Sequence, residues 1–178
     1  QPVLDGLAVH LEPDGASYRA TREEFLAGKP LPLTDAVIGK DGAFYFTIGG
    51  RGNQSGLYRV TYIGDEPTAP AGPLANDSGR GLRRLRHRLE SFHARLDPDA
   101  VDFSWRFLSH KDRFIRYAAR VAIEHQNVSS WQDRALQEPN PLARLEALVA
   151  LARQGDFSLR PRVLASLLEL DFKALDED

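Results

Sequence analysis

The first third of the chain alternates between short runs of β-forming residues and turn signals. Between the first two runs, Glu12 to Gly15 (EPDG) places a proline before Asp-Gly, which marks a chain reversal. Large side chains at adjacent positions of Leu57–Tyr62 predict that both faces of the last strand are at least partly covered. The expected strands of an antiparallel sheet are Gly6–Leu11, Ser17–Thr21, Thr34–Ile38, Ala43–Ile48 and Gly56–Ile63.

Residues 64–79 are expected to be a linker between two differently patterned segments. This stretch is rich in Pro, Gly, Ala and small polar residues, a composition typical of connections and not of a core. It separates a β segment, residues 1–63, from a helical segment, residues 80–178. The sequence therefore predicts an α+β fold, with a short antiparallel β segment followed by an α-helical repeat stack.

Beyond the linker, apolar residues recur with helical period. Leu82, Leu85, Leu89 and Phe92 form one apolar stripe at i, i+3, i+7 and i+10. Short connections favour antiparallel hairpins of helices. Further helices are expected at Pro98–Leu108 with Asp97 as N-cap, Lys111–His125, Ser129 or Ser130 to Leu136, Pro141–Gln154 and Leu159–Leu168. The expected core comprises Val101, Trp105, Leu108, Ile115, Ala119, Ala122, Leu145, Leu148, Leu151, Leu164 and Leu167, with Trp131 also packed inside.

Two of these helices repeat one pattern at a constant offset. Asp112–Ala122 aligns with Asn140–Ala150, each with a capping Asx, an arginine four residues on, and alanines three and six residues further. Small alanines on one face let a neighbouring helix approach closely. Each hairpin then leaves an apolar face for the next hairpin to cover. Residues 97–170 resemble HEAT-like repeats, which implies a scaffold that binds other protein domains.

Composition excludes several classes of chemistry. The 178 residues are 42% hydrophobic and 27% charged, with a formal net charge of -2, so no global charge attracts nucleic acid or an anionic membrane. No apolar run reaches the ~18 residues that span a bilayer, and the first residues lack a signal-peptide pattern. The absence of cysteine excludes disulfides, thiolate metal sites and covalent haem attachment within these residues.

The β segment resembles a β-propeller blade of the soluble glucose/sorbosone dehydrogenase type. The residues that carry this resemblance are Gly39–Gly49 (GKDGAFYFTIG) and Arg51–Val60 (RGNQSGLYRV). Together with the linker and the helices, they resemble the planctomycete and verrucomicrobial haem-binding or membrane-bound dehydrogenase-like proteins. The resemblance implies a periplasmic or cell-envelope location. It also implies a parent protein that uses haem c, or pyrroloquinoline quinone with calcium, while this segment itself holds no cofactor.

The glycine-rich stretch Gly49–Gly56 is the first candidate site. Its glycines allow close backbone approach, and its polar side chains offer donors for a carboxylate, sugar or quinone oxygen. The resemblance implies that this stretch lines the propeller mouth, although Gly49-Gly50 replaces the acid–base pair of quinoprotein glucose dehydrogenases. The alternative is an interstrand loop without a ligand. The candidate ligand-binding residues are Arg51, Asn53, Gln54 and the strand residue Asp35, with Asp41 assigned to a turn.

A cluster of arginines on the first helix is the second candidate site. One interpretation is a surface for an anionic partner, and the other is a solvated face opposite the leucine stripe. The candidate surface residues are Arg80, Arg83, Arg84 and Arg88, accompanied by Arg86 and His87. The five histidines have no metal-ligand spacing, and no G-x-S-x-G motif occurs, so neither a metal site nor a catalytic residue is expected.

The sequence favours an interaction role over catalysis. The leading hypothesis is a non-catalytic segment of a larger envelope protein that joins a β-propeller to downstream domains. Its expected partners are the rest of its own polypeptide or other protein domains, with no nucleic acid and no membrane span. An open sheet edge would also allow self-association. The alternative is part of a quinone- or haem-linked sugar or alcohol dehydrogenase, and the parent protein is dehydrogenase-like by resemblance.

Overall fold

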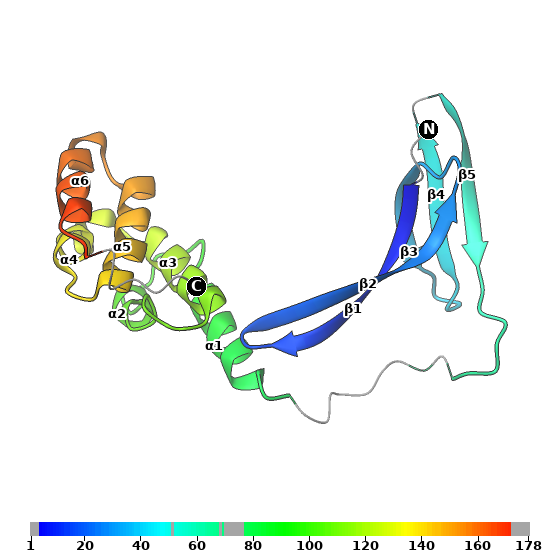
Figure 1. The fold of residues 1–178 in the computed structure, drawn as a ribbon, viewed down its shortest axis with the longest axis horizontal. Helices are drawn as coiled ribbons and strands as arrows, with labels where there is room; N and C mark the ends of the chain where they lie inside the picture. The colour runs from blue at the N-terminus through cyan, green and yellow to red at the C-terminus, as the bar shows by residue number, and fades with distance from the viewer. Residues whose placement is uncertain (1–3, 51, 68, 70–76, 172–178) are drawn as a thin grey trace. The chain divides into compact units, whose positions relative to one another are not determined.

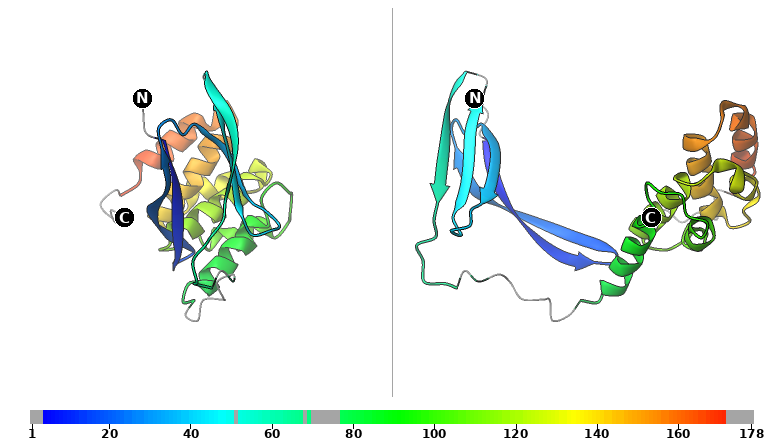
Figure 2. Two further views of the ribbon diagram at one scale, coloured as in Figure 1. Left: turned by 90° about the vertical axis from the view of Figure 1, so that its right-hand side faces the viewer. Right: turned by 180° about the vertical axis from the view of Figure 1, so that it is seen from behind.

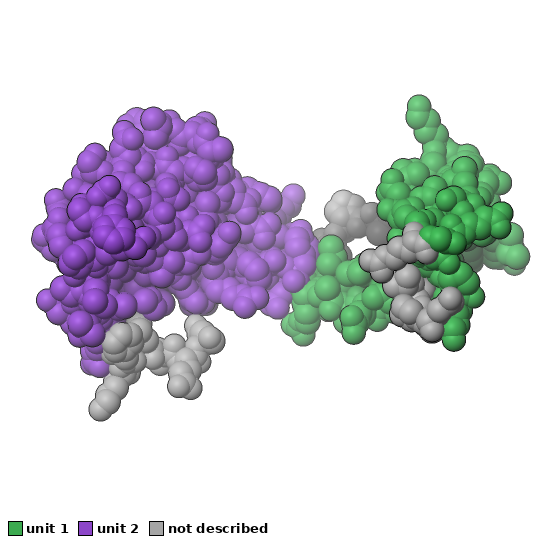
Figure 3. All heavy atoms as spheres, turned by 90° about the horizontal axis from the view of Figure 1, so that it is seen from above, with its two compact units in different colours: residues 1–12, 19–75 green, residues 13–18, 76–178 purple. Residues whose placement is uncertain are grey.

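The computed structural model describes residues 4–50, 52–67, 69 and 77–171 and divides into two compact units. Unit 1 comprises residues 1–12 and 19–75, and unit 2 comprises residues 13–18 and 76–178 (Figure 3). The described residues form two small antiparallel sheets and six α-helices, so the predicted α+β class is confirmed. Residues 13–18, which lie within the expected β segment, group with the helices.

Unit 1 is built from five strands (Figure 1). Strands β1 and β2 form a two-stranded sheet, and the others form a three-stranded sheet in the order β3-β4-β5, which Figure 2 shows from behind. All five expected strands are present, but β5 begins three residues before Gly56 and ends at Val60. The strands are β1 (Leu4–Asp14), β2 (Ser17–Gly28), β3 (Leu33–Ile38), β4 (Phe44–Gly50) and β5 (Asn53–Val60).

The three-stranded sheet has one partly covered face and one open face. On the covered face, Phe46 stacks on Tyr58 at 5.0 Å between ring centroids, and Phe25 of β2 meets Phe44 edge-on at 5.5 Å. On the open face, Val37 and Leu57 are 63% and 70% exposed. The prediction that both faces are covered is therefore wrong for the described residues, because β2 supplies side chains to one face only.

Unit 2 contains every expected helix, joined by short 3-10 turns at Val128–Ser130 and Phe157–Leu159. Pro98 precedes its helix instead of opening it. Asp97 Oδ1 accepts from the Asp99 N–H at 3.0 Å and forms a separate turn, so the helix begins at Ala100. The helices are α1 (Arg80–Glu90), α2 (Ala100–Trp105), α3 (Arg113–Glu124), α4 (Gln132–Gln137), α5 (Pro141–Gln154) and α6 (Arg160–Leu168).

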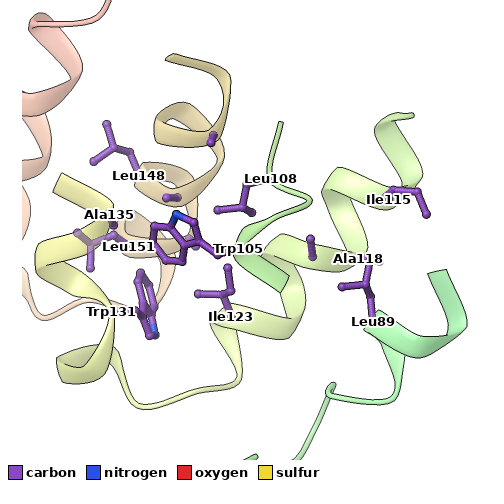
Figure 4. Close-up of a cluster of buried hydrophobic side chains, with 14 of the residues drawn as sticks. Leu89, Trp105, Leu108, Ile115, Ala118, Ile123, Trp131, Ala135, Leu148 and Leu151 are labelled. Carbon is purple, nitrogen blue, oxygen red and sulfur yellow. The ribbon is translucent and has the colours of Figure 1, made fainter. Parts of the chain in front are cut away.

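The core of unit 2 lies where α3 and α5 meet their neighbours. Figure 4 shows the Trp105 indole among Leu108, Ile123 and Leu151, and both tryptophans are buried. Burying large apolar side chains supplies most of the driving force for folding. Of the expected core, only Leu164 is exposed, at 56%, because α6 packs mainly on α4 and α5 and its other side is open. Three expected core residues, Val101, Leu145 and Leu167, are partly buried.

The repeated sequence pattern corresponds to a repeated local structure. The side chains of Asp112 and Asn140 both cap their helices, and they accept from Phe114 N and Ala143 N at 2.9 and 3.0 Å. The arginine four residues after each cap donates to a backbone carbonyl six residues before itself. The two pairs are Arg116 with His110 O and Arg144 with Glu138 O. The paired alanines Ala119, Ala122, Ala147 and Ala150 are all buried.

The tip of the β1–β2 hairpin is part of unit 2. Ala16 is fully buried, and its N–H donates to Asp112 Oδ2 at 2.7 Å. Arg83 forms an ion pair with Asp77, and its guanidinium lies 5.0 Å from the centroid of the Tyr18 ring. Gly15 has a φ of +55°, and a Cβ at this position would collide with Asp112 Oδ2. Glycine is therefore required at the turn for both backbone conformation and space.

We predict that Asp112→Ala destabilises unit 2 more than Asn140→Ala does. Both changes remove a helix cap, which costs about 1 kcal/mol. Only Asp112→Ala also leaves the buried Ala16 N–H unpaired, which adds about 2 kcal/mol. Urea unfolding followed by tryptophan fluorescence measures both, because the two tryptophans, Trp105 and Trp131, lie in unit 2. If both variants lose the same free energy of unfolding, the hydrogen bond from Ala16 to Asp112 does not stabilise unit 2.

Candidate functional site

The glycine-rich stretch is mostly strand and not a loop. Gly50 pairs with Asn53 across the β4–β5 reversal, so β5 already begins at Asn53. Gly50 and Gly52 have φ values of +87° and +79°, which glycine adopts without strain and which let the chain reverse within two residues. Asn53 Nδ2 donates to Gly50 O at 3.2 Å and holds this turn. The predicted site residue Arg51 lies outside the described residues.

Asn53 and Gln54 line one pocket of about 500 Å³ in unit 1. Its walls carry amide and hydroxyl groups beside an aromatic ring, and none of its lining side chains is charged. Such a lining suits a neutral polar ligand, for which amides supply hydrogen bonds and apolar rings supply contact area. The lining residues are Pro30, Pro32, Ile48, Asn53, Gln54, Ser55, Gly56, Leu57 and Tyr58.

Asp35 does not join this pocket. It lies beside a separate groove of about 60 Å³ that Val37, Tyr45 and Leu57 also line. Asp35 Oδ1 accepts from the N–H of Ala36 at 2.8 Å, so the carboxylate is engaged with its own strand. The structure therefore brings Asn53 and Gln54 together and places Asp35 elsewhere on the sheet.

A polar cluster that the sequence reasoning missed lies on the open face of the sheet. Arg59 Nη2 and the Tyr45 hydroxyl each donate to Asp41 Oδ2 at 2.9 Å. The hydrogen bond from Arg59, followed by that from Tyr45, lowers the pKa of Asp41 below its ordinary value of 3.8. Tyr45 stands opposite Arg59 in the β4–β5 register, so the cluster ties the β3–β4 turn to β5. The sequence alone does not give the β4–β5 register, so it could not predict this cluster.

The arginines of α1 divide into two groups. Arg83 is 6% exposed and turned inward, where its Nη1 donates to Gly15 O at 3.4 Å, so it is not part of an exposed basic surface. The reason is that Asp77 and the hairpin tip supply its partners. Arg80, Arg84 and Arg88 are exposed and four residues apart, and none of the three has an ion-pair partner among the described residues. Arg86 pairs with Glu90 at 3.1 Å.

A ladder of ion pairs joins α3 to α5. Arg120 Nη1 lies 2.9 Å from Glu146 Oε2, and Arg153 Nε lies 3.0 Å from Glu124 Oε2. Arg120 also pairs with Glu124 along α3, at 3.3 Å. Glu124 is only 9% exposed, and a carboxylate buried this deeply requires such cationic partners. Each acid of the ladder thus faces arginine, which indicates a structural role at the helix interface. The i, i+4 spacing of Arg120 and Glu124 was the signal available in the sequence.

The histidines do not converge on a metal site. The rings of His93 and His125 stack at 5.9 Å between centroids, and His93 Nε2 lies 3.0 Å from Ala118 O. Over the described ranges, no group of three or more metal-ligating side chains is placed to hold an ion. Within the same ranges, no helix has the length and apolar character needed to cross a membrane.

Comparisons with known proteins add no family or fold assignment. No family model matches the chain, and neither a curated protein nor a solved structure matches it. Function is therefore inferred from the residues and contacts of this chain.

We predict that Arg83→Ala destabilises unit 2, whereas the neighbouring Arg84→Ala does not. Removing Arg83 leaves Asp77 without its cation and Gly15 O without its donor, at a cost of about 3 kcal/mol. Arg84 is exposed, so its loss should change the free energy of unfolding by less than about 0.5 kcal/mol. Thermal unfolding of both variants tests this difference. If Arg83→Ala leaves the stability of unit 2 unchanged, the structural role assigned to Arg83 is wrong.

We also predict that Arg59→Gln raises the pKa of Asp41 toward its ordinary value, since Arg59 is the largest cause of the lowering. A lowered folded-state pKa means that the stabilisation is complete above the ordinary value of 3.8 and is lost as the pH falls through the folded-state value. An NMR titration of the Asp41 carboxyl carbon measures the pKa. Arg84→Gln, in unit 2, serves as the control. An unchanged titration in Arg59→Gln would contradict the assigned cause.

Proposed function

We propose that this chain is a non-catalytic scaffold segment of a larger envelope protein, where it joins a β-propeller to downstream domains. The observation that carries the proposal is the apolar surface of unit 1. Soluble domains rarely leave extended apolar patches uncovered unless a partner binds there. Among the described residues of this unit, ten large apolar ones are exposed: Leu7, Val9, Leu11, Phe25, Val37, Ile38, Leu57, Tyr58, Tyr62 and Ile63.

The open face of the three-stranded sheet is the part of this surface best suited to another layer. Val37 and Leu57 lie on the same face as Tyr45, because Val37 and Tyr45 are register partners and Leu57 is two residues from Arg59. The Asp41–Tyr45–Arg59 cluster pairs the charges of Asp41 and Arg59 on this face with each other. Covering the two apolar side chains would contribute roughly 25 cal/mol per Å² of apolar area removed from water.

The helical unit is proposed to be a HEAT-like stack. Support comes from the matching caps at Asp112 and Asn140 and from Ala119, Ala147 and Ala150, which are buried in one core cluster. At the last hairpin, an apolar groove of about 310 Å³ lies between α5 and α6. Its lining includes Leu151, Val163 and Leu164, the kind of surface that a following repeat or domain would cover.

The envelope location and the parent's cofactor belong to the proposal through the family resemblance of Gly39–Val60. Haem c, or pyrroloquinoline quinone with calcium, would be held by other parts of the parent polypeptide. The Gly49-Gly50 pair supplies no acid or base at the position where the resembling enzymes carry them. In this proposal the segment contributes surface and spacing, and the chemistry belongs to its neighbours.

A second candidate function is supported by the uncharged pocket beside Asn53 and Gln54. The segment would then form part of a quinone- or haem-linked sugar or alcohol dehydrogenase. Its pocket of about 500 Å³ falls within the usual range for small-ligand sites. Amide and hydroxyl groups would meet the ligand's own hydroxyls, and the Tyr58 ring would supply contact area.

Thiol labelling tests the scaffold proposal, because the chain has no cysteine of its own. Val37→Cys and Leu164→Cys should react readily in the 178-residue chain, since both positions are exposed. In the parent polypeptide, the same thiols should react more slowly by a factor of about ten or greater, because the covering domain must open locally before they react. Arg84→Cys should react equally in both settings. If Val37→Cys and Leu164→Cys react as fast in the parent polypeptide as in the 178-residue chain, the scaffold proposal is overturned.

The second candidate is tested by dye-linked oxidation of sugars and alcohols by the parent protein, with and without pyrroloquinoline quinone and calcium. Turnover that Gln54→Ala abolishes and Gln137→Ala preserves would favour the dehydrogenase. Absence of turnover with every cofactor would remove it and would leave the labelling result unaffected.

A further inference from the structure

The two edges of the three-stranded sheet are not equivalent. Strands β3 and β5 each pair with β4 on one side only, so each presents main-chain donors and acceptors on the other side. An exposed edge of this kind pairs readily with another extended chain unless the sequence prevents it. Whether each edge is protected can be read from its own residues.

The β3 edge carries several protective features. The strand has six residues and follows Pro32, and its register shifts between Leu33 and Asp35. Asp35 is exposed in the middle of the strand, where its charge opposes pairing with another chain. Its carboxylate also accepts from the Ala36 N–H at 2.8 Å, so that donor is already occupied. A short, irregular and charged edge is a poor template for a further strand.

The β5 edge lacks the proline and the mid-strand carboxylate of β3, although its register with β4 also shifts, between Asn53 and Gly56. The strand has eight residues, contains no proline, and pairs with β4 without irregularity from Gly56 to Val60. Its only charged residue is Arg59, which Asp41 and Tyr45 already engage from within the same sheet. Leu57, near the middle of the strand, is 70% exposed, and the neighbouring Tyr58 is 46% exposed. The β5 edge is therefore open to strand addition.

We propose that the β5 edge binds the β5 strand of a second copy of this chain, in antiparallel pairing about a two-fold axis. A two-fold axis at Leu57 places Leu57 opposite Leu57 and Arg59 opposite Ser55 of the other copy, so no like charges meet. The exposed Leu57 side chains then lie next to one another at the axis. Such an isologous pairing closes at two copies and produces one six-stranded sheet.

The inference does not depend on the propeller or on the dehydrogenase alternative. It concerns only the residues of β5 and their contacts within unit 1. The labelling test above would succeed or fail through Val37 and Leu164, whereas the dimer is tested through β5 in the 178-residue chain alone.

Sedimentation equilibrium of the 178-residue chain tests the dimer. The wild-type chain should show a concentration-dependent monomer–dimer equilibrium. Leu57→Lys should raise the dimer dissociation constant about tenfold or more, because two lysines then meet at the axis. Val37→Lys is the matched control, since Val37 is also exposed on the open face but lies on β3, and it should leave the constant unchanged. A monomer at every concentration, or equal weakening by both variants, would overturn the proposal.

Disulfide cross-linking gives a second measurement that does not rely on a disruptive change. Single cysteines at positions 55–59 are introduced one at a time into the cysteine-free chain and oxidised. A two-fold axis at Leu57 predicts one maximum of dimeric product at position 57 and a decline on either side, because only the residue at the axis faces its own copy. Val37→Cys should form little dimer. A flat profile along β5, or stronger cross-linking at Val37→Cys, would overturn the antiparallel pairing.

Discussion

The Asp112 carboxylate holds together two parts of the helical unit that are far apart in the sequence. One oxygen caps α3 through Phe114 N and Ile115 N, and the other accepts from the buried Ala16 N–H. Because both oxygens have partners, the start of α3 and the hairpin tip are fixed relative to each other. Arg83 completes the same junction through Gly15 O, Tyr18 and Asp77. These contacts join the hairpin tip to α1 and to the start of α3.

The interface between α3 and α5 adds a second level of organisation. Ala119, Ala147 and Ala150 are buried in the core cluster to which both helices contribute, where small side chains allow close approach. The ion pairs of Arg120, Glu124, Glu146 and Arg153 also join the two helices. Close packing gives such an interface its strength, whereas the paired charges chiefly fix its register. A surface made of regularly repeated contacts, with its last hairpin open, is consistent with a scaffold role.

Much of the helical unit could be predicted from the sequence, because its signals are local. The leucine stripe, the Asx caps and the alanine spacing each act within a few residues, and the expected helices are present within a few residues of their predicted bounds. The failures involve partners distant in the sequence. Arg83 is buried because Gly15, at a separation of 68 residues, lies beside it. Periodicity on α1 carries no information about that neighbour.

The sheet was harder to predict, for a related reason. Strand existence follows from composition, but register depends on pairing across turns. Gly50 and Gly52 have positive φ, and the reversal between β4 and β5 is short. Asn53 and Gln54, which were expected in a loop, therefore belong to β5. The Asp41–Tyr45–Arg59 cluster and the separation of Asp35 from the pocket both follow from that register. Whether the open face is exposed depends on whether another element packs against it. The pattern of residues along a strand does not specify this.

The assignment of the hairpin tip to the helices has a practical consequence for dividing this chain. Residues 64–79 look like the natural place to cut, yet a shortened polypeptide that starts there would lose Pro13–Tyr18. The truncated helices would then expose the surface that Ala16 covers and would leave one Asp112 oxygen without its donor. Poor solubility of such a truncation would reflect the loss of Pro13–Tyr18 from unit 2. Adding these residues to the amino terminus of the truncated chain should restore its solubility.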